Sequence, residues 1–405
     1  MARSGARRVI FLVESPFGTR RSEQLGIETL LRAGLDVQLW DFAAILRPLM
    51  PRSASGESRG DSRASTRVFM HMRDAVRAIR SARDGDTMFA TLLSYRGGTL
   101  PLYRALRGTR FALFASIGFP FGETPQRARR PSDDSQRTLR SIVHGALAVR
   151  VPKSLLGVGV PELIVAGGTE SLTAPFSRGA GPRTRVLWAH VPDYDQVLEA
   201  RAQAAVDVHS PCIVFLDQYL AGHPDQLLHQ QPFCDPTTYF ANLRRAFDDA
   251  EQALGLPVVV AAHPVAAYAL EDEAFGGRRI ESGATLALLR RARLVLAHDS
   301  TAVGWAALLR RPVTFLTDEG IQRSDVRRES MMALASRLGR RIYNLDCGTT
   351  PAWHDELQVD ARRYAEYCEA FIKRPGSPER PSWDLFADYV AGAASTEPLR
   401  ADLGA

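Results

Sequence analysis

The 405 residues, of which 45% are hydrophobic and 24% charged, are enough for two soluble globular domains, each with its own core. No apolar run approaches the roughly 20 residues that cross a bilayer, and the four cysteines form no CxxC pair, which argues against a zinc site or a disulfide framework. Residues 1–150 carry 25 arginines against 13 acidic residues without the interleaved aromatics of a nucleic-acid surface, so the candidate partners are an anionic glycan, a lipid-linked phosphate or the inner membrane surface.

The N-terminus imitates a signal peptide, because basic residues precede the apolar run Val9–Val13. That run is too short, and Glu14 follows it where a cleavage region should lie, so we interpret it as the first strand of a cytoplasmic protein. A helix over Ser22–Ala33 and a strand over Val37–Trp40 complete a parallel βαβ unit. Residues 51–67, rich in Ser, Arg and Gly, predict a mobile loop.

Strands and helices continue to alternate along the rest of the chain. In the first half we expect a helix at His71–Ala82. Strands are expected at Met88–Leu93, Phe111–Ser116, Leu147–Val151, Leu163–Ala166 and Arg185–His190. In the second half we expect strands at Cys212–Leu216, Pro257–Ala262, Leu294–Ala297 and Val313–Leu316, with helices at Tyr239–Leu254, Thr285–Arg291, Ala302–Leu309, Tyr364–Ile372 and Trp383–Ala391.

This pattern predicts an α/β fold of two Rossmann-like, doubly wound domains that face each other across a cleft. We expect an N-terminal domain over residues 1–205 that binds the acceptor. A second domain over residues 206–378 binds the activated substrate. Residues 379–405 form a helix and tail that pack back on the first domain. Ligands of such folds bind at the carboxyl ends of the strands, which places the expected active site in the cleft.

The most informative residues follow two predicted strands of the second domain. His263-Pro264 comes directly after one strand, and Ser300-Thr301 follows another at the start of a helix. Hydroxyls and free N–H groups at a helix N-terminus bind anions. Alone, the first pair is an ordinary polar strand end and the second an ordinary N-cap. We expect the two strand ends to be neighbours, so that together they bind one phosphate.

Further candidates follow other strands. Asp217, at the end of a strand in the second domain, is a candidate general base or nucleophile, with a turn aspartate as the alternative. In the first domain Glu14, Arg20 and Arg21 are candidates for receiving an anionic acceptor, with a solvated loop as the alternative. This segment lacks GxGxxG, which argues against a nicotinamide or flavin cofactor. Asp193-Tyr-Asp195 imitates a DxD metal motif, but such triplets are common by chance and we expect no metal.

The motifs resemble those of the GT-B glycosyltransferases of bacterial surface carbohydrate synthesis, and more narrowly the group of sialyltransferases, polysialyltransferases and Kdo transferases. His263-Pro264 is similar to the HP motif of that group, and His298-Asp-Ser300-Thr301-Ala302 is similar to its serine motif. The resemblance implies that His263, Pro264, His298, Ser300 and Thr301 hold the phosphate and ribose of a CMP-sugar. It implies no cofactor beyond this nucleotide-sugar donor.

The segments Glu14–Phe17, Asp193–Asp195, Phe215–Tyr219 and Ile372–Pro378 extend the resemblance over most of the chain. The Asp/Glu-Asp/Glu-Gly signature of many sialyltransferases is absent, which favours Asp217 as the catalytic carboxylate, as in retaining Kdo transferases. The hypothesis is transfer of Kdo or another nonulosonate from CMP to a surface polysaccharide or lipid-linked glycan, with catalytic roles for Asp217, His263 and Glu14 and acceptor contacts from Arg20, Arg21, Asp193 and Asp195. Alternatives are a UDP or GDP donor, a UDP-sugar 2-epimerase, and a non-enzymatic sugar-nucleotide-binding component of a capsule assembly complex.

Overall fold

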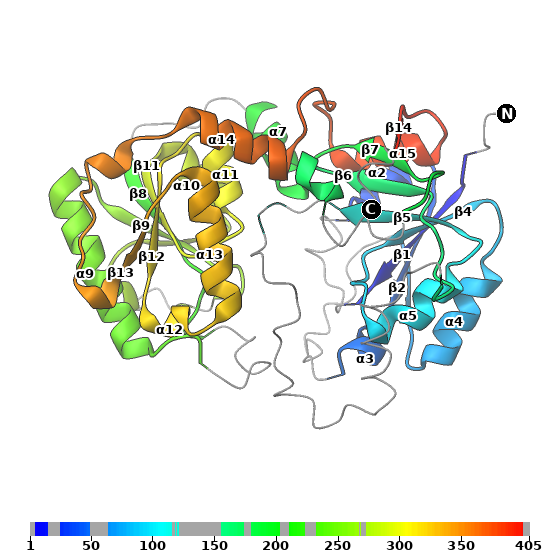
Figure 1. Ribbon diagram of the computed structural model, residues 1–405, viewed down its shortest axis with the longest axis horizontal. Coiled ribbons are helices and arrows are strands. Elements are labelled where there is room, and N and C mark those ends of the chain that lie inside the picture. Colours follow the sequence, from blue (N-terminus) through cyan, green and yellow to red (C-terminus); the bar gives the residue numbers. More distant parts are fainter. Residues whose placement is uncertain are drawn as a thin grey trace. The chain divides into compact units, whose positions relative to one another are not determined.

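The computed structural model describes residues 5–14, 25–48, 64–115, 118, 120, 155–173, 180–202, 210–222, 232–266, 268 and 273–399. The chain divides into two compact units. Unit 1 comprises Met1–Ile117, Asp134–Asp195 and Lys373–Ala405, and unit 2 comprises Gly118–Asp133 and Gln196–Ile372. Each unit is built on one β-sheet with helices packed against it (Figure 1). Among the helices in the described ranges, none combines the length and the apolar character needed to span a membrane.

Unit 1 contains an eight-stranded sheet in the order β14-β7-β6-β5-β4-β1-β2-β3. All neighbouring strands are parallel except β14, which runs antiparallel to β7. The strands are β1 (Arg8–Val13), β2 (Asp36–Asp41), β3 (Ser65–Val68), β4 (Thr87–Thr91), β5 (Arg110–Ala115), β6 (Leu163–Ala166), β7 (Arg185–Trp188) and β14 (Glu397–Pro398). The helices are α2 (Ile27–Arg32), α3 (Ala43–Leu46), α4 (Met72–Ser81), α5 (Leu100–Ala105), α15 (Ser382–Val390) and the start of α7 (Pro192–Ala202).

Strand β1 explains why this sheet has helices on both faces. Successive side chains of a strand point to opposite faces, and in β1 both sets are apolar. Phe11 and its alternate neighbours belong to a core with α2 and α15, whereas Ile10 and Leu12 belong to a core with α4 and α5. A strand buried on both faces reads as a continuous apolar run, as Val9–Val13 does.

Unit 2 contains a six-stranded sheet in the order β10-β9-β8-β11-β12-β13, and all its neighbouring strands are parallel. The strands are β8 (Cys212–Leu216), β9 (Val258–Ala262), β10 (Ile280–Ser282), β11 (Ala292–Ala297), β12 (Val313–Thr317) and β13 (Ile342–Asn344). The helices are α9 (Pro236–Leu254), α10 (Thr285–Arg291), α11 (Val303–Leu308), α12 (Glu319–Gln322), α13 (Asp325–Leu338) and α14 (Ala361–Tyr367), which continues as a π-helical turn over Cys368–Ile372.

Helix α9 illustrates how local sequence specifies this unit. Asp235 accepts a hydrogen bond from the backbone N–H of Thr238 at 2.9 Å, and Pro236 occupies the first helical position. Tyr239, Leu243 and Phe247 follow at helical spacing and are buried. Gly255 ends the helix with a φ of 63°, a left-handed conformation that glycine adopts without strain.

The predicted fold class is confirmed, with two Rossmann-like units. In each sheet the first strand lies between the second and the fourth, which is the doubly wound order. One prediction was wrong: residues 65–67, expected within a loop, belong to the edge strand β3. All four β3 side chains are exposed, so the strand is held by backbone pairing with β2 and leaves no apolar signature. The predicted strand at residues 147–151 lies outside the described residues.

Candidate functional site

The carboxyl end of strand β8 is the centre of the candidate site in unit 2. Strand β8 pairs with β9 on one side and with β11 on the other, so the residues that follow these three strands lie along one edge of the sheet. Asp217 follows β8, His263 follows β9 and His298 follows β11. The prediction that the ends of β9 and β11 are neighbours was wrong, because β8 separates them. In a doubly wound sheet ligands bind where the strand order reverses, here between β8 and β11.

Asp217 links two of these strand ends. Its side chain is buried, with 4% of the residue exposed. Its Oδ1 accepts a hydrogen bond from the backbone N–H of Tyr219 at 2.8 Å, and Oδ2 accepts one from the backbone N–H of His263 at 3.3 Å. Burial raises the pKa of Asp217, and the hydrogen bonds that stabilise the carboxylate offset this only in part. The group therefore accepts protons more readily than an exposed aspartate, while it also positions His263.

His263 lies in a turn and is half-buried. The backbone N–H of Val265 donates to His263 Nδ1 at 3.4 Å, and the His263 carbonyl accepts from the N–H of Ala266 at 2.8 Å. Because Nδ1 accepts a hydrogen bond, the proton of the neutral imidazole is on Nε2. This tautomer provides an N–H donor of the kind that a phosphate oxygen accepts.

Ser300 and Thr301 differ in exposure. Ser300 is buried, and its Oγ accepts from the backbone N–H of Ala302 at 3.3 Å, whereas Thr301 is exposed. Helix α11 begins only at Val303, so these residues lie in the turn before it rather than in its first turn. The hydroxyl of Thr301 is therefore the more accessible of the two to a ligand.

A cation that sequence reasoning missed lies beside this turn. Arg327 Nη1 is 2.9 Å from Asp299 Oδ1, and its guanidinium stacks 4.4 Å from the ring centroid of Phe233. Arg327 comes from α13, a helix that was not predicted from the sequence because exposed apolar residues obscure its buried stripe. The one feature of the sequence that points to this cation is its partner Asp299, which lies between His298 and Ser300 in the serine motif. The ion pair holds the guanidinium at Asp299, the residue that precedes Ser300.

His298 belongs to the core instead of the ligand site. It is fully buried, its Nδ1 lies 2.6 Å from the carbonyl oxygen of Leu316, and its Nε2 lies 3.0 Å from the hydroxyl of Tyr239. Since a carbonyl only accepts, Nδ1 carries the proton and Nε2 accepts from Tyr239. Burial lowers the pKa of His298 to about 4, so the ring is neutral. Both nitrogens are used within the protein, so His298 has no ring nitrogen to offer the phosphate that the resemblance assigned to it.

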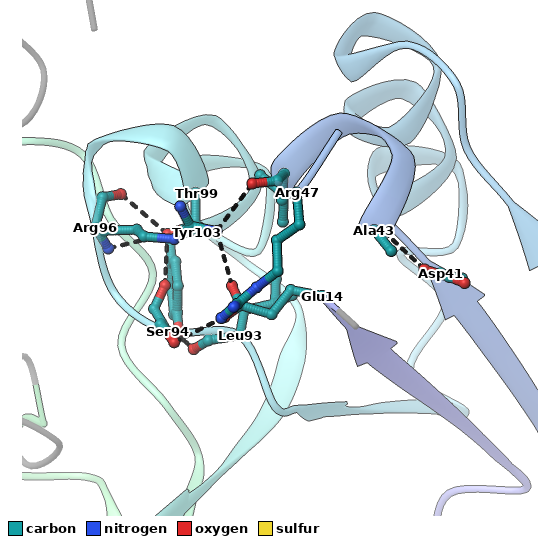
Figure 2. A network of polar contacts seen from close by, with 10 residues as sticks. Glu14, Asp41, Ala43, Arg47, Leu93, Ser94, Arg96, Thr99 and Tyr103 are labelled. Carbon is teal, nitrogen blue, oxygen red and sulfur yellow. Dashed lines mark hydrogen bonds and ion pairs between the residues drawn. The ribbon is translucent and has the colours of Figure 1, made fainter. Parts of the chain in front are cut away.

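A second polar cluster lies at the corresponding edge of unit 1, where β1 and β4 end side by side. Figure 2 shows Glu14 of this cluster surrounded by three donors. Its Oε1 lies 2.7 Å from Arg47 Nη2 and 2.9 Å from Ser94 Oγ, and its Oε2 lies 3.4 Å from Arg96 Nη2. Burial alone would raise the pKa of Glu14, but the hydrogen bond from Arg47 and the charge of Arg96 outweigh it and the pKa is lowered. The cluster thus holds an ionised carboxylate and two cations.

The DxD-like triplet forms hydrogen bonds with the C-terminal segment of unit 1. Asp195 accepts from the backbone N–H of Ser382 at 3.0 Å and from its Oγ at 2.7 Å, at the first residue of α15. Tyr194 donates from its hydroxyl to Glu379 Oε2 at 2.7 Å. Burial raises the pKa of Asp193. These contacts are structural, and within the described ranges no group of three or more His, Cys, Asp or Glu residues is arranged to hold a metal ion.

Of the predicted site residues, the structure therefore brings together Asp217, His263 and Pro264, with Ser300 and Thr301 after the neighbouring strand on the other side of β8. Glu14 belongs to unit 1 and has its own cluster. Arg20 and Arg21 lie outside the described residues.

Solved structures share this architecture. A structure titled as the glycotransferase of kitacinnamycin is 14% identical over 98% of this chain and 100% of its own, with a TM-score of 0.50. The wall teichoic acid polymerase TagF (H548A) is 11% identical over 96% of this chain and 89% of its own, also with a TM-score of 0.50. The chain has the GT-B fold. No protein-family model and no curated protein matches the sequence.

We expect Glu14→Gln to lower the free energy of unfolding of this GT-B protein by about 2 kcal/mol at neutral pH. The substitution removes the negative charge of a buried carboxylate that pairs with two half-exposed arginines. The folded-state pKa of Glu14 is below its usual value of 4.5. The stabilisation is therefore complete above that value and is lost as the pH falls through the folded-state pKa. Urea unfolding of both proteins at neutral and acidic pH measures this.

Asp74→Asn is the control for Glu14→Gln, because Asp74 pairs with Arg77 on an exposed helix surface at 3.7 Å. We expect it to change stability by less than about 0.5 kcal/mol. If the difference in the free energy of unfolding between wild type and Glu14→Gln were the same at neutral and acidic pH, Glu14 would not be an ionised, buried carboxylate.

Proposed function

We propose that the chain is a glycosyltransferase that takes its sugar from a nucleotide donor bound at the carboxyl edge of unit 2. The observation that carries the proposal is the alignment of Asp217, His263 and Ser300-Thr301 on three adjacent strand ends. This edge includes the reversal of strand order, where doubly wound folds bind their ligands. The GT-B fold supports the proposal, since the similar structures named above include a glycotransferase.

In this proposal the phosphate of the nucleotide sugar accepts hydrogen bonds from neutral and cationic side chains. His263 offers its Nε2–H, Thr301 its exposed hydroxyl, and Arg327 a guanidinium fixed by Asp299. Charge develops on the phosphate as the sugar departs, so prearranged donors stabilise the transition state more than the ground state.

Asp217 is the proposed nucleophile. Its carboxylate attacks the anomeric carbon, the bond from that carbon to the phosphate oxygen breaks, and the electron pair leaves with the nucleotide. The acceptor hydroxyl then displaces Asp217, so the carboxylate is regenerated and the hydroxyl proton is released. Burial raises the pKa of Asp217, which makes it a better proton acceptor than an exposed aspartate and equally fits a role as general base in a single displacement.

The donor is further proposed to be CMP-activated Kdo or another nonulosonate, and the acceptor a bacterial surface polysaccharide or lipid-linked glycan. The support is the similarity of His263-Pro264 and of Asp299-Ser300-Thr301 to the HP and serine motifs. Acceptor contacts are proposed for unit 1, where the Glu14 cluster carries two arginines.

Thermal unfolding with CMP, UDP and GDP tests the donor. A ligand that binds only the folded state at about 100 times its dissociation constant stabilises it by about 2.7 kcal/mol. We expect the largest rise in Tm with CMP, loss of that rise in His263→Ala, and no loss in His354→Ala, which removes an exposed histidine of unit 2. A larger rise with UDP or GDP would contradict the CMP donor, and no rise with any of them would contradict nucleotide binding.

A further inference from the structure

An arginine-lined hollow lies on unit 1 at the edge where strands β4 and β5 begin, which is the edge opposite to the Glu14 cluster. It has a volume of about 820 Å³. Helices α4 and α5 lie side by side in unit 1 (Figure 1), and Arg80 of α4 and Arg104 of α5 are among the residues that line the hollow. The residues that line it, here called the arginine hollow, are Arg80, Arg83, Arg104, Arg107, Gly108, Leu155, Leu156 and Gly157.

Within the described part of the chain, no carboxylate offsets the charge of the arginine hollow. Its four arginines are all exposed, and none of them forms an ion pair with a carboxylate of the described residues. The carboxyl ends of α4 and α5 face the same region, and each helix end contributes about half a negative charge. About one negative charge thus opposes four positive ones, and the excess favours an anionic ligand.

A neighbouring hollow of about 350 Å³ on the other side of α4 provides a comparison within the same unit. It is also lined by arginines, but Asp74 and Asp84 are among its lining residues. Arg77 lies 3.7 Å from Asp74, and Arg8 lies 3.4 Å from Asp84. Two aspartates thus offset most of the charge of the three arginines there, whereas no carboxylate lines the arginine hollow.

Two of the four guanidiniums are held in place by backbone carbonyls. Arg83 Nη2 donates to the carbonyl of Ala105 at 3.0 Å, and Arg104 Nε donates to the carbonyl of Leu156 at 2.7 Å. A guanidinium has five N–H donors, so each of these arginines keeps donors for a ligand. Fixed guanidiniums lose less side-chain entropy when they bind, and their geometry matches two oxygens of a phosphate.

We propose that the arginine hollow binds a phosphate-bearing anion with two or more negative charges, separately from the donor site of unit 2. The guanidinium of arginine matches the geometry of a phosphate. Four such cations around one hollow carry more positive charge than a single carboxylate would neutralise. The anion is either a soluble phosphate compound or the headgroup of an anionic lipid. Leu155, which lines the hollow and is 78% exposed, adds an apolar contact with a lipid and none with an inorganic phosphate.

The test uses the full chain with two probes: inorganic pyrophosphate in calorimetric titrations, and vesicles with or without phosphatidylglycerol in a phosphatidylcholine background in sedimentation. The variant is Arg80→Gln/Arg107→Gln, because neither side chain makes a hydrogen bond or ion pair with the described residues and the fold should be kept. The control is Arg73→Gln/Arg77→Gln, which removes the same charge from the exposed surface of α4 outside the hollow. Equal Tm values verify that both variants fold.

We expect the first double variant to weaken binding of at least one probe by about tenfold or more, and the control by about threefold or less, with binding weakened further as salt screens the charges. Loss of pyrophosphate binding identifies a soluble phosphate compound. Loss of vesicle binding alone, reproduced by Leu155→Ser, identifies a lipid headgroup. Equal losses in the variant and its control, or no binding of either probe to the wild type, would overturn the proposal.

Discussion

Asp217→Asn is expected to reduce sugar transfer by about 1,000-fold or more, because an amide is neither a nucleophile nor a useful base at neutral pH. Nucleotide binding should stay measurable, since His263, Thr301 and Arg327 remain. Turnover with donor and acceptor, together with a nucleotide titration, measures the two effects separately. Because the carboxylate acts in its ionised form and burial raises its pKa, wild-type transfer should also fall with decreasing pH while the pH is still above 3.8, the ordinary pKa of an aspartate.

The control for Asp217→Asn is Asp318→Asn. Asp318 is likewise a buried aspartate with a raised pKa that follows a strand of the same sheet, but its Oδ1 accepts from the N–H of Ile321 and caps α12. We expect a loss of stability without a comparable loss of transfer. If Asp217→Asn removed nucleotide binding and transfer in proportion, Asp217 would be a positioning residue for His263, and the nucleophile assignment would be lost.

Gly26→Ala is expected to lower the stability of unit 1 by about 2–4 kcal/mol. Gly26 has a φ of +58°, and an added Cβ would lie 2.1 Å from Cγ of Trp383. The left-handed backbone costs an alanine about 1 kcal/mol, and displacing a packed aromatic ring costs about 1–3 kcal/mol more. Trp383 packs edge-on against Phe11 with ring centroids 5.6 Å apart, so the ring has little room to move. Chemical denaturation measures the loss.

Gly34→Ala separates the two contributions of Gly26→Ala. Gly34 has a φ of +80°, yet nothing lies within 4 Å of an added Cβ. We therefore expect a loss of about 1 kcal/mol from backbone strain alone. Equal losses in the two variants would mean that the close approach of Trp383 to Gly26 does not contribute to the stability of this unit.

The central strands were predictable from the sequence because they are buried on both faces. Val9–Val13 and Cys212–Leu216 are continuous apolar runs that end at a carboxylate, and the structure has strands at both. Strand β3 was not predictable, since its side chains are exposed and it pairs with β2 through the backbone without an alternation of apolar and polar residues. Helix α13 was missed because Val326 and Met332, which are apolar but exposed, obscure the buried stripe that begins at Met331.

The candidate site was predictable in its residue types more than in its arrangement. Each strand-end residue could be recognised from the apolar run before it, but the neighbours of a strand depend on the whole sheet, and β8 lies between β9 and β11. The role of His298 was equally hidden, because burial and the partners Tyr239 and Leu316 come from elements distant in sequence. The donors around Glu14 come from two segments distant from it in sequence, with Arg47 in one and Ser94 and Arg96 in the other, and no local pattern connects them.

The most direct test of the central claim is a crystal structure of the chain with CMP bound. The account predicts that the phosphate lies at the carboxyl edge of the unit 2 sheet, within hydrogen-bonding distance of His263 Nε2 and the hydroxyl of Thr301. A phosphate bound instead at the Glu14 cluster or only in the arginine hollow, with the ends of β8, β9 and β11 unoccupied, would contradict it.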